Sequence, residues 1–121
     1  MSLSADQIAR FQKQGYTTIA DFFTGDEVVA MQAEIERFKR VGLLRNVAMD
    51  GTGTTQSSTR QNLQLCPMSP HSALFRALAF DPKVIDAVRS LIGDPILLQL
   101  NQVFLKPARH GAGTNWHQDN A

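Results

Sequence analysis

Residues 102–119 read QVFLKPARHGAGTNWHQD, and this stretch decides both the fold and the chemistry that the sequence predicts. The alternation of side chains over 96–106 predicts a strand, because successive side chains of a strand point to opposite faces. Gln102 and Lys106 share one of these faces. The proline and glycines that follow, over 107–113, predict a turn-rich connection into the last segment.

The last segment carries two candidate metal ligands, His117 and Asp119. In an extended backbone these side chains project from the same face about 7 Å apart, so that an imidazole nitrogen and a carboxylate oxygen can converge on one ion. Non-haem Fe(II) oxygenases use two histidines and one carboxylate, which leaves open positions on the metal for other ligands. The sequence therefore predicts His117 and Asp119 as two ligands of a metal site. We expect Trp116, on the opposite face, to pack in the core.

Two helices are predicted near the start of the chain by capping boxes, in which a hydroxyl side chain is followed three residues later by Glu or Gln. Ser4 with Gln7 predicts the first helix, and Thr24 with Glu27 predicts the second. Between these helices, residues 16–20 are rich in β-forming side chains and predict a short strand.

The middle of the chain has a polar stretch followed by two predicted helices. Residues 46–62 are rich in Gly, Thr and Ser and predict a loop or a loose hairpin. Ser69-Pro70 and Asp81-Pro82 each predict the start of a helix, because proline suits the first turn.

Composition sets limits on the class of protein. The chain has 121 residues, which favours a single domain over 1–121, and a net charge of +1 without a basic stripe, which argues against nucleic-acid binding. The apolar runs, 96–98 among them, are far too short to span a membrane. The first residues lack the pattern of a signal peptide, and the one cysteine, Cys66, cannot form an internal disulfide, so we expect a cytoplasmic protein. We expect Cys66 to be a small buried side chain rather than a nucleophile.

The motifs at 102–107, 111–113 and 116–119, together with the order of the predicted elements before them, resemble the phytanoyl-CoA dioxygenase family. The resemblance implies an α+β chain in which N-terminal helices are followed by the first strands of a double-stranded β-helix, a cupin-like jelly roll that these residues leave incomplete. It also implies an Fe(II)- and 2-oxoglutarate-dependent dioxygenase that hydroxylates a small organic substrate.

The resemblance assigns roles to five residues. His117 and Asp119 match the first two iron ligands of the family. Gln102, Lys106 and Gln64 match positions near the 2-oxoglutarate. No residue of this chain matches the third ligand or the arginine that binds the far carboxylate of 2-oxoglutarate, so we expect these 121 residues to be inactive by themselves.

Two alternatives to an oxygenase fragment stay open. One is a metal-free binding or scaffold module derived from the same fold. The other is a zinc hydrolase, which would need three protein ligands and an open water position, whereas only two suitably spaced ligands are present. The sequence leaves the prime substrate and the oligomeric state undetermined.

Overall fold

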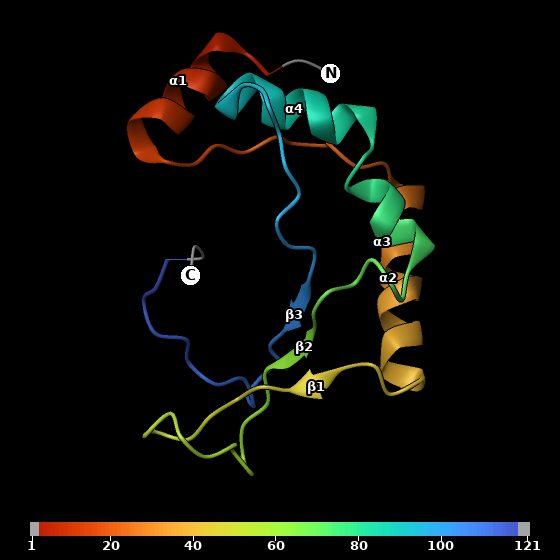
Figure 1. Ribbon diagram of the computed structural model, residues 1–121, viewed down its shortest axis with the longest axis vertical. Helices are drawn as coiled ribbons and strands as arrows, with labels where there is room; N and C mark the ends of the chain where they lie inside the picture. Colours follow the sequence, from red (N-terminus) through yellow and green to blue (C-terminus); the bar gives the residue numbers. More distant parts are fainter. Residues whose placement is uncertain (1–2, 119–121) are drawn as a thin grey trace.

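The structure is a computed structural model that describes residues 3–118, and it combines helices with a small antiparallel sheet (Figure 1). This arrangement confirms the predicted α+β class. The elements in chain order are α1 (Ala5–Gln14), α2 (Gly25–Arg40), β1 (Arg45–Asn46), β2 (Leu63–Leu65), α3 (Ala73–Leu78), α4 (Pro82–Ile92) and β3 (Val103–Leu105). Helix α1 lies against α4 at one end, and α2 lies against α3 along one side of the sheet.

Both predicted capping boxes are present. The Gln7 amide nitrogen donates to Ser4 Oγ over 3.2 Å, and the Ser4 nitrogen donates to Gln7 Oε1 over 2.9 Å. Thr24 and Glu27 make the equivalent pair at 3.2 and 2.8 Å. Each box satisfies backbone donors that a helix start would otherwise leave without partners, so α1 and α2 begin where the sequence predicts.

The prediction of a strand over 16–20 is wrong. These residues form an irregular connection between α1 and α2, and Gln7 Nε2 donates to the Thr18 carbonyl oxygen over 2.8 Å. The preference of a residue for strands depends on pairing with a neighbouring strand. In the described structure this connection is held by a helix side chain instead.

The core lies where α2, α3 and the sheet meet. Phe38 of α2 is completely buried, and its ring packs against Phe75 of α3 with centroids 5.9 Å apart. Leu65 of β2 and Met68 complete the buried cluster. Burial of these large apolar side chains is the main favourable term that fixes the sheet relative to the two helices.

The helix predicted at Ser69-Pro70 begins later. Ser72 is the N-cap of α3, and its Oγ accepts a hydrogen bond from the Phe75 nitrogen over 3.2 Å. Ser69 and Pro70 lie in the preceding turn. The buried hydroxyl of Ser72 caps α3 directly, whereas Ser69 offers its carbonyl oxygen to Arg76.

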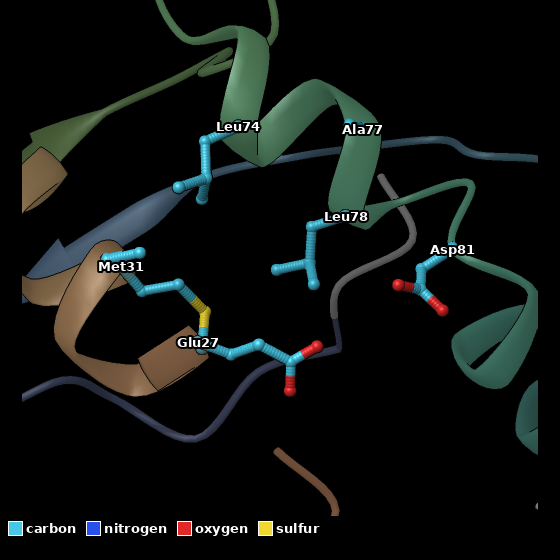
Figure 2. A pocket seen from close by; sticks show the side chains of 7 residues that line it. Glu27, Met31, Leu74, Ala77, Leu78 and Asp81 are labelled. Atoms are coloured by element: carbon cyan, nitrogen blue, oxygen red, sulfur yellow. The ribbon is translucent and has the colours of Figure 1, made fainter. Parts of the chain in front are cut away.

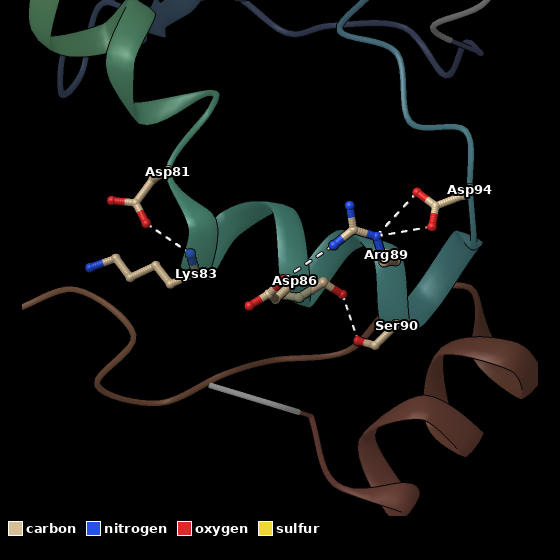
Figure 3. A network of polar contacts seen from close by, with 7 residues as sticks. Asp81, Lys83, Asp86, Arg89, Ser90 and Asp94 are labelled. Carbon is tan, nitrogen blue, oxygen red and sulfur yellow. Dashed lines mark hydrogen bonds and ion pairs between the residues drawn. The ribbon is translucent and has the colours of Figure 1, made fainter.

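Helix α4 begins as predicted, with Asp81 as the N-cap and Pro82 at its first position. Figure 3 shows its polar side, where Arg89 reaches Asp86 at 3.3 Å and Asp94 at 3.0 Å, beyond the end of the helix. Within the part of the chain that the structure describes, no helix is both long enough and apolar enough to cross a bilayer.

A shallow groove of about 230 Å³ separates α2 from α3 (Figure 2). Met31, Leu74 and Leu78 give it an apolar floor, while Glu27 and Asp81 lie at one end. Glu27 is bound by Lys83, whose Nζ lies 2.6 Å from both carboxylate oxygens. This ion pair joins the start of α2 to α4 and lowers the pKa of Glu27.

The sheet has the order β1-β2-β3 with antiparallel neighbours, and Gln64 pairs with Arg45 on one side and Phe104 on the other. The strand predicted over 96–106 is shorter in the structure, where only Val103–Leu105 is a strand. The predicted alternation holds around β3, because Gln102, Phe104 and Lys106 are exposed while the residues between them are partly buried.

Residues 46–62 form the loose hairpin that the sequence predicts as one of two outcomes. Met49 and Gln56 make an isolated antiparallel bridge. The Asp50 nitrogen donates to the Thr55 carbonyl oxygen over 2.8 Å, and the Ser57 nitrogen donates to the Ala48 carbonyl oxygen over 2.8 Å. The polar tip of the hairpin is therefore organised by its own backbone.

Candidate functional site

The exposed face of the sheet brings together two residues that the resemblance places near 2-oxoglutarate. Gln64 lies opposite Phe104 in the register of β2 and β3, so its side chain shares a face with Gln102. Gln64 Nε2 donates to Gln102 Oε1 over 2.8 Å. The two amides form a polar pair across the strands.

Lys106 links this face to the segment that carries the metal-binding motif. Its Nζ lies 2.8 Å from Thr114 Oγ1 and 5.8 Å from the centroid of the Phe104 ring. The chain passes close to Lys106 at Gly111, where a Cβ would lie 3.1 Å from the Lys106 Cβ. A glycine at 111 thus allows the turn to fold back along the strand.

The end of the hairpin holds the glycine-rich turn by three hydrogen bonds. The Ala112 nitrogen donates to Asn62 Oδ1 over 3.0 Å, and the Gln61 nitrogen donates to the His110 carbonyl oxygen over 2.8 Å. Arg60 Nη1 donates to the Gly111 carbonyl oxygen over 3.3 Å. We call residues 60–62 with 110–112 the turn clamp, and it fixes the chain shortly before His117.

Asn62 lies at the centre of this clamp, and Asn46, outside the clamp, holds it in place. Asn62 is only 5% exposed, and its backbone nitrogen donates to Asn46 Oδ1 over 3.0 Å. Asn46 Oδ1 also accepts from the Ala48 nitrogen, while Asn46 Nδ2 donates to the Arg60 carbonyl oxygen, both over 3.0 Å. Buried polar groups are costly unless they are hydrogen-bonded, so these contacts specify one arrangement of hairpin and turn.

His117 is exposed, and its Nδ1 lies 2.7 Å from the Asn115 carbonyl oxygen. A carbonyl oxygen only accepts hydrogen bonds, so Nδ1 is the donor in this contact. This arrangement, in which one ring nitrogen donates to a backbone carbonyl, is typical of histidines that ligate metals. The chemistry of His117 therefore fits a metal ligand.

The other predicted ligand, Asp119, lies outside the described residues. Within residues 3–118 there is no cluster of three or more His, Cys, Asp or Glu side chains that could hold a metal ion. His71 lies in the turn before α3, and His110 in the turn after β3. The structure therefore leaves the pairing of His117 with Asp119 as a prediction.

Two expectations about single side chains are wrong. Cys66 is exposed rather than buried, because β2 ends at Leu65 and the chain turns outward. Trp116 is fully exposed rather than packed in the core, and it lines a hollow beside His117. In the described structure the segment 111–118 runs without a strand or helix, so its side chains do not alternate between core and solvent.

No local pattern in the sequence indicates a role for Arg45, Asn46 or Asn62. Arg45 lies opposite Gln64, and both line a hollow of about 340 Å³ beside the sheet. The pairing register between two strands that are distant in sequence places Arg45 there. The residue pattern of one strand does not determine this register. The two asparagines lie in a polar stretch in which only tertiary contacts distinguish buried from exposed side chains.

The sequence of this chain is similar to a family model and to several known proteins. The family model described as phytanoyl-CoA dioxygenase matches residues 11–121. The ectoine dioxygenase of Bordetella bronchiseptica is 28% identical over 120 residues, which cover 98% of this chain and 37% of that protein. That of Sphingopyxis alaskensis is 28% identical over 118 residues, covering 97% of this chain and 37% of its own length.

A more distant relative is the probable alpha-ketoglutarate-dependent hypophosphite dioxygenase of Stutzerimonas stutzeri, which is 24% identical over 119 residues, covering 95% of this chain and 41% of that protein. No solved structure gives a significant match. The chain thus spans well under half the length of these curated relatives. Because the family model matches nearly the whole sequence, the chain belongs to the phytanoyl-CoA dioxygenase family.

Proposed function

We propose that this chain is the N-terminal part of an Fe(II)- and 2-oxoglutarate-dependent dioxygenase that hydroxylates a small organic substrate. His117 and Asp119 would supply two of its three iron ligands, and Gln64, Gln102 and Lys106 would line the 2-oxoglutarate site. Support comes from the family match over residues 11–121 and from relatives named as dioxygenases.

The observation that carries the proposal is the contact between Lys106 and Thr114. It connects the sheet face that presents Gln64 and Gln102 to the segment that ends in His117. The three residues assigned to the co-substrate thus share one face around β2 and β3, and one of them, Lys106, contacts the segment that leads toward the metal-binding motif.

The residues of this chain would bind and orient rather than transfer protons. His117 would bind the metal through its imidazole ring, whose Nδ1 contacts the Asn115 carbonyl oxygen. The amide pair and the Lys106 ammonium offer hydrogen-bond donors of the kind that carboxylates accept. Bound iron would couple the decarboxylation of 2-oxoglutarate by dioxygen, which yields succinate and carbon dioxide, to hydroxylation of the substrate.

The 121 residues by themselves are proposed to be inactive. A 2-His-1-carboxylate site needs one more histidine than the motif at 117–119 contains. The relatives are more than twice as long as the matched region, so the missing ligand would come from the remainder of a full-length protein. That full-length protein, and not the 121-residue chain, is the enzyme in this proposal.

The test is an assay of the full-length protein for succinate formed from 2-oxoglutarate, with Fe(II), Zn(II) or a chelator. We expect succinate only with Fe(II), and none from the 121-residue chain under the same conditions. Hydrolysis supported by Zn(II) would favour the hydrolase alternative. Absence of both activities and of metal binding would leave the scaffold alternative.

A further inference from the structure

The chain reverses direction directly after β3. The His110 and Gly111 nitrogens both donate to the Pro107 carbonyl oxygen, over 3.2 and 2.9 Å, and Arg109 has a positive φ of 66°. A positive φ is uncommon outside glycine and is typical of a tight turn. Because Gly111 has no Cβ, the chain that leaves this turn can pass close to the Lys106 side chain. The turn therefore brings the following segment back beside Lys106.

Lys106 contacts this segment beyond the turn clamp. Its Nζ donates to Thr114 Oγ1 over 2.8 Å, three residues before His117. The clamp already holds 110–112, so the bond to Thr114 extends the restrained part of the chain toward the metal-binding motif. The Phe104 ring, whose centroid lies 5.8 Å from Nζ, favours an ammonium group at this place through cation–π attraction.

The segment that leads to His117 needs such a restraint because it has no regular structure of its own. Among the described residues, 111–118 contains no helix or strand, and Asn115, Trp116 and His117 are exposed. A segment of this kind has many accessible conformations, and ordering it only when the metal binds would weaken the binding. A contact that restricts these conformations beforehand raises the affinity for the metal.

We propose that Lys106 and Thr114 are positioning residues that hold the segment before His117 in place for metal binding. The inference rests on the proposed function, because His117 is a metal ligand only there. A lysine ammonium has three N–H donors, and Thr114 uses one of them, so two remain for a carboxylate of 2-oxoglutarate. One ammonium group can therefore contact the co-substrate and hold the metal-binding segment at the same time.

The test removes the acceptor and the donor of this bond in the iron-free full-length protein. Thr114→Val replaces the hydroxyl by a methyl group of similar size, and Lys106→Met removes the ammonium group. NMR relaxation measures the order of the 113–117 backbone before metal is added, and Co(II) is then titrated as the probe for the metal. Because 2-oxoglutarate is absent, a loss of affinity does not reflect binding of the co-substrate.

We expect each variant to bind Co(II) about three- to ten-fold more weakly, the scale of one hydrogen bond, and to lower the backbone order over 113–117. If both residues act through one bond, the double variant should lose no more affinity than either single variant. Thr114→Ser keeps the hydroxyl and should restore the affinity. Thr18→Val, the same replacement at an exposed residue between α1 and α2, is the control and should have no effect.

Unchanged Co(II) affinity or unchanged backbone order in Thr114→Val would overturn the inference, as would losses that add in the double variant or an equal loss in Thr18→Val. Failure of the unmodified protein to bind Co(II) would instead contradict the proposed function. In that case the backbone order over 113–117 still decides whether Lys106 and Thr114 hold the segment.

Discussion

Gln64 on β2 donates a hydrogen bond from Nε2 to Oε1 of Gln102, 2.8 Å away beside β3. This bond orients both amides, because it uses the oxygen of Gln102 and leaves its NH₂ group as the outward donor. A carboxylate only accepts hydrogen bonds, and Gln102 keeps both of its N–H donors whereas Gln64 keeps one, so in the proposed site Gln102 is the better donor to 2-oxoglutarate.

Replacing the two glutamines separately tests which of them donates to 2-oxoglutarate. Gln102→Ala should raise the KM for 2-oxoglutarate of the full-length protein about ten-fold, the scale of one hydrogen bond to a charged group. Gln64→Ala should have a smaller effect, because it acts through the orientation of Gln102. Gln99→Ala, in the exposed segment before β3, is the control. A larger effect of Gln64→Ala would reverse the assignment.

Loss of the clamp side chain should destabilise the protein. Asn62→Ala removes the acceptor of the Ala112 nitrogen at a site only 5% exposed, with an expected cost of about 1–3 kcal/mol in the free energy of unfolding. Urea denaturation measures this cost. Gln61→Ala is the matched control, because Gln61 binds His110 through its backbone nitrogen and should retain that contact. Equal stability of the two variants would show that the clamp contributes nothing.

Replacing an aromatic side chain of the core should cause a larger loss in the free energy of unfolding. Phe38→Ala leaves a cavity against Phe75 and should lower the free energy of unfolding by about 3–5 kcal/mol. Phe80→Ala, at a side chain 63% exposed, should change it little. Thermal denaturation of both variants compares the two sites, and similar shifts would contradict the assignment of Phe38 to the core.

Stability should depend on pH through Glu34. Arg37 Nε and Nη2 lie 2.8 and 2.7 Å from its two oxygens, and this pair, helped by the Ser72 hydroxyl, lowers the pKa of Glu34 to about 2 from 4.5. A carboxylate with a lowered pKa in the folded state stabilises it above the unfolded value, and this stability is lost as pH falls from about 4.5 to about 2.

The variant Glu34→Gln therefore should be less stable than the unmodified protein near neutral pH, and the difference should shrink as the pH approaches 2 to 3. Urea denaturation at several pH values measures the difference in the free energy of unfolding. A difference that stays constant over this range would show that the charge of Glu34 does not contribute.

The elements that local sequence predicts correctly are those whose signals lie within a few residues. Ser4 with Gln7, Thr24 with Glu27, and Asp81-Pro82 act on their own helix starts, and each is confirmed. Strands differ, because they need a partner elsewhere in the chain. The β-forming residues 16–20 are not a strand in the structure, and the strand predicted over 96–106 is paired only at Val103–Leu105.

The residues of the candidate site likewise divide into those that a local pattern predicts and those that depend on contacts between distant segments. The spacing of the motif predicts His117 as a ligand, which stays a prediction, and a period of two correctly places Gln102 and Lys106 on one face around β3. The contact of Gln64 with Gln102 and the burial of Asn62 depend on register and on contacts between segments distant in sequence. No local pattern encodes these distances, so they emerge only from the folded chain.

The measurement that tests the central claim most directly is the affinity of Fe(II) for the full-length protein with and without 2-oxoglutarate, compared between His117→Ala, Asp119→Ala and His110→Ala. The account predicts that the first two variants lose Fe(II) binding and succinate formation, whereas His110→Ala retains both and binds Fe(II) more tightly when 2-oxoglutarate is present. Full Fe(II) affinity in His117→Ala or Asp119→Ala would contradict the account.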